Sequence, residues 1–118
     1  MLNKMIKMVA VAMTALVAMA SIADETQNTQ LAQLTAGFDA EAKYMASCFA
    51  CHSTGAAGAP KVGAGTASEW EPRLEKGMDA VMANVINGVN TMPPKGLCFD
   101  CTDEDLRAIV DYMIAASQ

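Results

Sequence analysis

Cys48-Phe49-Ala50-Cys51-His52 is the stretch that determines which fold this chain adopts. Two cysteines three positions apart at a helix end lie close enough to form thioether bonds with the two vinyl groups of one haem. The histidine directly after the second cysteine then reaches the haem iron from one side. The motif predicts a covalently attached haem around which the rest of the chain folds.

Two other interpretations use the same cysteines. A zinc site would combine Cys48 and Cys51 with the second pair, Cys98 and Cys101, but 46 residues separate the two pairs. Zinc ribbons have roughly 15–20 residues there. A thiol-disulfide oxidoreductase has its CxxC beside alternating strands and helices, and no strand is predicted in this chain. Both interpretations are therefore less favoured than haem.

His52 is the only histidine of the chain, which excludes a haem with two histidine ligands from one subunit. The second axial position falls to a methionine, a lysine or a weaker group, or it stays open. Three methionines after the motif lie on predicted amphipathic helix stripes, where packing in the core explains them: Met78, Met82 and Met113.

Met92 differs because it lies in a loop, directly before Pro93 and Pro94. Proline restricts the preceding residue to extended conformations, so the loop presents the Met92 sulfur at a fixed point. We predict His52 and Met92 as the axial ligands of the iron. A methionine ligand raises the reduction potential of a haem relative to a second histidine, and two protein ligands favour electron transfer over catalysis at the iron.

The N-terminal residues have the pattern of a secretory signal peptide. Lys4 and Lys7 are followed by an apolar run from Met8 to Ala20 and by small residues up to Ala23. A retained membrane anchor is the alternative, but a span needs about 20 apolar residues. We expect cleavage after Ala20 or Ala23 and export to a bacterial periplasm, with residues 1–23 as the signal peptide, 24–36 as a polar leader and 37–118 as the functional domain.

The expected mature chain is acidic. Removing 23 of the 118 residues takes away two of the eight basic side chains and none of the 13 acidic ones, which leaves 95 residues with a net charge of −7. Such a surface argues against nucleic acid and anionic lipid as partners and predicts redox proteins with basic docking faces. The domain also has few aromatic residues, so a bound cofactor is expected to supply part of its core.

The remaining pattern predicts an all-α domain. Four helices are expected, over residues 38–50, 69–76, 78–86 and 103–114, joined by Gly/Pro-rich loops. Ser68 is the predicted N-cap of the second helix, with Pro72 in its first turn. Gly88 ends the third helix, and Thr102 with Asp105 forms a capping box at the start of the last.

Together these features resemble the class I cytochromes c, and more closely the cytochrome c5 family, from about residue 37 to residue 115. The specific part is the stretch from Met92 to Cys101 (MPPKGLCFDC), in which a second CxxC follows the ligand methionine. The resemblance implies a structural disulfide between Cys98 and Cys101, which suits an oxidising compartment. A redox-active dithiol is the alternative for this pair.

The resemblance also implies roles around the cofactor. The carbonyl of Pro60 would accept the Nδ1 proton of His52, and Tyr44 would pack against the terminal helix. Trp70 and Arg73 would lie near the haem propionates. Core packing is the alternative for Trp70, and a solvated surface charge is the alternative for Arg73.

The predicted function is therefore that of a monohaem electron carrier. We expect a cytochrome c-like domain of about four helices around one haem c, which shuttles single electrons between respiratory redox partners and is not an enzyme. A haem enzyme or ligand sensor in which Met92 dissociates is the main rival. A thiol oxidoreductase without haem is the second rival.

Overall fold

The computed structural model describes residues 33–118, so the predicted signal peptide and residues 24–32 of the leader lie outside the described part. Its α-helices are α1 (Ala40–Lys43), α2 (Phe49–His52), α3 (Ala67–Leu74), α4 (Met78–Asn87) and α5 (Asp103–Ala115). Over the described residues, the only strand-like pairing is an isolated bridge between Val89 and Met92. The all-α prediction is confirmed. None of the described helices is both long and apolar enough to cross a membrane.

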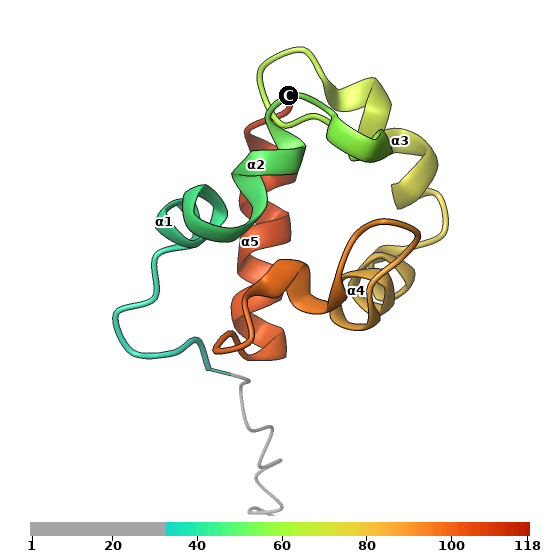
Figure 1. Ribbon diagram of the computed structural model, residues 1–118. Helices are drawn as coiled ribbons and strands as arrows, with labels where there is room; N and C mark the ends of the chain where they lie inside the picture. Colours follow the sequence, from blue (N-terminus) through green and yellow to red (C-terminus); the bar gives the residue numbers. More distant parts are fainter. Residues whose placement is uncertain (1–32) are drawn as a thin grey trace, which may run out of the picture. The chain divides into compact units, whose positions relative to one another are not determined.

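Helix α5 runs through the middle of the domain, with α1 on one side of it and α3 and α4 on the other, while α2 overlaps its upper part in this view (Figure 1). Its apolar stripe forms the centre of the core. The buried residues of this core come from α5, from the first helical segment, from α3 and from the disulfide loop: Tyr44, Trp70, Cys98, Cys101, Leu106, Ile109 and Met113. Tyr44 contacts Tyr112 of α5 with a ring separation of 5.5 Å, so the predicted packing of Tyr44 on the terminal helix is confirmed.

The first predicted helix is one helical run made of α1, a π-helical turn over Tyr44–Cys48 and α2. It begins two residues later than predicted, because the carboxylate of Asp39 caps it by accepting a bond of 2.9 Å from Ala42 N. It also continues to His52. π-helical turns are rare and occur often at functional sites; this one ends at the first cysteine of the haem motif.

Helix α3 begins earlier than predicted, and the prediction of Ser68 as its N-cap is wrong. The N-cap residue is Thr66, and Ser68 lies in the first turn. The Thr66 hydroxyl donates to the carbonyls of Lys61 and Gly63, so it stabilises the preceding loop rather than the helix. Pro72 consequently lies inside α3 and not in its first turn.

Helices α4 and α5 have the predicted ends. Gly88 follows α4, and the capping box of Thr102 and Asp105 starts α5. Asp105 has a second role that was not predicted from the sequence. This buried carboxylate accepts bonds from Thr35 N (2.9 Å) and Thr35 Oγ1 (2.7 Å), and so holds the segment before α1 against the start of α5.

Candidate functional site

A cavity of about 600 Å³ lies among the helices of the domain. The predicted site residues that line it are Cys48, Cys51, His52, Pro60, Trp70, Arg73 and Met92. A second, shallower hollow of about 480 Å³ between α4 and α5 contains none of them. Residues more than 40 positions apart in the sequence, among them the cysteines and Met92, therefore meet at one site.

His52 ends α2 and is buried, with 7% of its surface exposed. Its Nδ1 lies 2.8 Å from the carbonyl oxygen of Pro60, and since a carbonyl only accepts, Nδ1 carries the proton and donates. The pKa of His52 is lowered from its ordinary value. Burial is the largest cause and the charge of Arg73 also lowers the pKa, while the hydrogen bond to Pro60 partly offsets them. The neutral ring keeps its Nε2 lone pair for a metal.

The imidazole is also oriented from a second side. The indole of Trp70 stacks on it with ring centroids 6.2 Å apart and an angle of 20° between the planes. Trp70 Nε1 donates to the carbonyl of Lys61 at 2.8 Å, so the indole N–H already has a partner. These contacts favour packing as the role of Trp70.

Cys48 and Cys51 lie at the cavity wall on the π-helical turn and on α2, and both thiols are free in the described chain. Cys48 is partly buried, and burial raises the pKa of its thiol, with Cys51 adding to the shift. Cys98 and Cys101, in contrast, are buried outside the cavity and joined by a disulfide with an S–S distance of 2.01 Å. Two of the four ligands of the alternative zinc site are thereby removed.

Met92 reaches the cavity from the loop after α4. Its backbone pairs with Val89 through two bonds, Met92 N to Val89 O (2.9 Å) and Val89 N to Met92 O (3.1 Å). A Cβ added to Gly96 would lie 3.8 Å from both Cys48 Sγ and Met92 Cε. The methionine and the first cysteine thus approach the cavity at neighbouring points.

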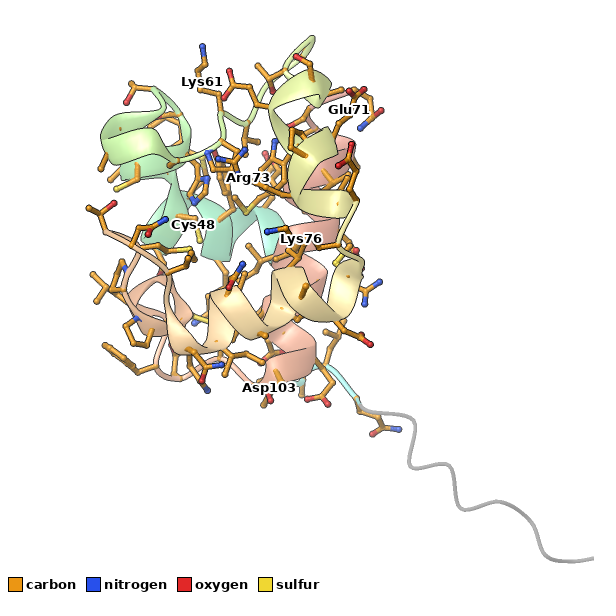
Figure 2. All side chains as sticks on the ribbon, turned by 90° about the vertical axis from the view of Figure 1, so that its right-hand side faces the viewer. Cys48, Lys61, Glu71, Arg73, Lys76 and Asp103 are labelled. Carbon is orange, nitrogen blue, oxygen red and sulfur yellow. A yellow bond between two sulfur atoms is a disulfide. The ribbon has the colours of Figure 1, made fainter. Side chains whose placement is uncertain are left out.

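Two cations line the cavity, Arg73 at the end of α3 and Lys76 in the turn that follows the helix, and Figure 2 shows both near the opening that faces Cys48. The Arg73 guanidinium donates to the backbone carbonyls of Glu69 and Gly58, so it bridges α3 and the loop opposite. Lys76 was not predicted as a site residue. The expected helix over 69–76 ends two residues early, at Leu74, so Lys76 reaches the cavity from the following turn and no helical spacing indicates it.

The donors at the cavity match a covalent haem. An imidazole nitrogen and a thioether sulfur are ligands for iron, whereas magnesium and calcium require oxygen. The two free thiols supply the attachment points, and the volume lies within the range of about 300–1,000 Å³ that cofactor sites have.

Comparisons with known proteins agree with this fit. A protein family described as "Cytochrome C oxidase, cbb3-type, subunit III" matches residues 35–113. Cytochrome c5 of Azotobacter vinelandii is 44% identical over 78 residues, which cover 66% of this chain and 90% of that protein.

Two solved structures are also similar. A mono-heme ferrocytochrome c from Shewanella putrefaciens is 47% identical with a TM-score of 0.58, covering 74% of this chain and all of that one. A chain from an electron transfer complex of nitrite reductase with cytochrome c is 38% identical with a TM-score of 0.60, covering 73% of this chain and all of that one.

Proposed function

This chain belongs to the cytochrome c5 family of class I monohaem cytochromes c, and from that premise we propose that His52 and Met92 are the axial ligands of its haem iron. The protein is an electron carrier with one covalently bound haem c. Cys48 and Cys51 are the thioether attachment points in this proposal.

One observation carries the ligand assignment: the single histidine, with Nδ1 held by Pro60, and the loop methionine line the same cavity. When bound, the haem supplies an iron that accepts and releases one electron. The chain's own residues orient the imidazole through Pro60 and Trp70, provide a soft sulfur from Met92 and exclude water with a largely apolar wall. Arg73 and Lys76 line the cavity and would offer positive charge to the two haem carboxylates.

With both axial positions filled, the iron has no open site for a substrate, and the proposed role excludes catalysis. The partners are redox proteins, a role consistent with the cytochrome in the nitrite reductase complex. Because the expected mature chain carries a net charge of −7, these partners present basic docking faces, and electron transfer slows as salt screens the attraction. The site of action is the periplasm, reached through a signal peptide at residues 1–23 that is followed by a leader at 24–36.

Absorption spectra of the holoprotein and of Met92→Ala test this function. Wild-type protein is expected to be low-spin in the oxidised state, with the long-wavelength band of a thioether-ligated ferric iron. Met92→Ala loses that band, becomes high-spin and binds added imidazole, because an axial position has opened. Met45→Ala is the matched control, since Met45 is 53% exposed and outside the cavity lining.

A high-spin wild-type spectrum at neutral pH would contradict the proposal and support the haem enzyme or sensor. Colourless protein from cells with a complete haem-attachment system would support the thiol oxidoreductase. Mass spectrometry of the peptide spanning Cys48 and Cys51 tests the attachment separately, because a thioether-bound haem stays on the peptide after denaturation.

A further inference from the structure

Gly88 ends α4 four residues before Met92, in a backbone conformation that side chains do not tolerate. Its φ of 81° and ψ of 158° lie in a region populated almost only by glycine. Gly77, at the other end of the same helix, has nearly the same conformation, with φ 85° and ψ 157°. Conformation alone therefore explains why both positions hold glycine and does not distinguish them.

The surroundings of the two glycines differ. At Gly77, an added Cβ would meet no atom within 4 Å in the described chain. At Gly88 it would lie 2.8 Å from Met92 O, 2.9 Å from Pro94 N and 3.1 Å from the carbonyl carbon of Pro93. All three are backbone atoms, so no side chain can rotate to make room.

A shift of the Met92 backbone moves the root of the side chain that carries the sulfur. Two backbone bonds tie Met92 to Val89, and the Thr91 hydroxyl donates to Ala57 O across the loop at 3.2 Å. Ordinary contact begins at 3.4 Å, so a Cβ at Gly88 would push the Met92 carbonyl by about half an ångström. Metal-ligand distances tolerate only about 0.2 Å.

We propose that Gly88 is the positioning residue for the axial methionine: the absence of a side chain lets the Met92–Pro94 backbone lie directly on the end of α4. This inference rests on the proposed role of Met92 as a ligand. Gly88 touches the ligand's backbone and not the iron, so it acts on the haem only through Met92.

Gly88→Ala and Gly77→Ala holoproteins are the matched pair that tests it. Both carry the same backbone strain, and only the first has the collision. We measure the affinity for added imidazole, which binds when Met92 leaves the iron, together with the thioether band and the reduction potential. Imidazole affinity is expected to rise about tenfold or more in Gly88→Ala relative to Gly77→Ala, with a weaker band and a lower potential.

The Met92→Ala background separates the two proposals. If Met92→Ala leaves the spectrum unchanged, the ligand assignment itself is wrong. If Met92→Ala opens the iron but the two alanine variants bind imidazole equally, the role of Gly88 is wrong. If Gly88→Ala changes the imidazole affinity by the same factor in the wild-type and Met92→Ala backgrounds, the role of Gly88 is also wrong. The effect of Gly88 would then not act through Met92.

Should Gly88→Ala fail to yield holoprotein, the pair Gly88→Asn and Gly77→Asn gives the same comparison. Asparagine carries the same Cβ and is enriched at positive φ, chiefly in the left-handed helical region; at the ψ near 158° of both glycines it is strained as well, and equally at the two positions. The expected order of imidazole affinity is unchanged, and equal affinities in this pair would refute the proposal.

Discussion

Replacing Asp105 by asparagine is expected to remove a stabilisation that depends on pH. The carboxylate is 1% exposed and accepts three bonds: Thr35 N at 2.9 Å, Thr35 Oγ1 at 2.7 Å and Thr102 N at 3.0 Å. Burial raises the pKa of Asp105, but the bonds from Thr35 and Thr102 outweigh burial and hold the pKa at about 2, against an ordinary value of 3.8.

The magnitude follows from this difference. One pKa unit corresponds to 1.36 kcal/mol, so ionised Asp105 stabilises the folded state by about 2 kcal/mol. Because the folded pKa is depressed, this contribution is complete well above pH 4. It is lost as the pH falls through 4 towards 2, where the folded carboxyl also takes up its proton.

Urea unfolding of wild-type and Asp105→Asn holoprotein at pH values from 6 to 2 measures the effect. The free energy of unfolding of the variant is expected to be lower by about 2 kcal/mol at pH 6, and the gap is expected to close by a similar amount by pH 2. Groups that titrate equally in both proteins cancel in this difference. Asp103→Asn, an exposed residue in the same helical turn, is the control and should leave stability nearly unchanged.

A gap between wild type and Asp105→Asn that stays constant from pH 6 to pH 2 would refute the reasoning. It would mean that the carboxylate is not held in its charged form by Thr35 and Thr102. A gap that widens on acidification would be a stronger contradiction, because it would require the pKa of the folded carboxyl to lie above its ordinary value.

Two other perturbations test the core and the second CxxC. Ile109→Ala removes a side chain that is 2% exposed at the centre of α5, so urea unfolding should show a loss of about 2–5 kcal/mol, while the partly buried Ile114 should cost less when truncated. Thiol titration of denatured, unreduced holoprotein should find no free thiol, because the proposal binds Cys48 and Cys51 to haem and Cys98 is bonded to Cys101. Two reactive thiols would contradict the disulfide.

The helices and their ends were predictable where short-range chemistry determines them. The capping box at Thr102 and the stop at Gly88 depend on residues within four positions, and both were predicted correctly. The N-cap of α3 was not. Serine and threonine are both favoured at N-cap positions, so the sequence does not distinguish Ser68 from Thr66. The helix begins after Thr66 because the hydroxyl of Thr66 bonds to Lys61 and Gly63 in the preceding loop.

For the site, the residue types are enough to predict the chemistry. A CxxCH motif, a single histidine and a methionine held by two prolines leave few alternatives, because each residue type has a restricted set of metal and cofactor bonds. Lys76 was missed, since a surface cation carries no such restriction until the turn after α3 is known to line the cavity.

Which contacts support that chemistry depends on how the whole chain packs. Thr35 and Asp105 are 70 positions apart, and nothing local to either residue indicates the other. Gly77 and Gly88 flank the two ends of α4 with nearly the same backbone conformation; only the return of the chain through Pro94 makes Gly88 sterically essential. Helix propensity and the metal-ligand preference of a side chain depend on a residue and its neighbours in the sequence. The close approach of two backbone segments depends on the packing of the whole chain.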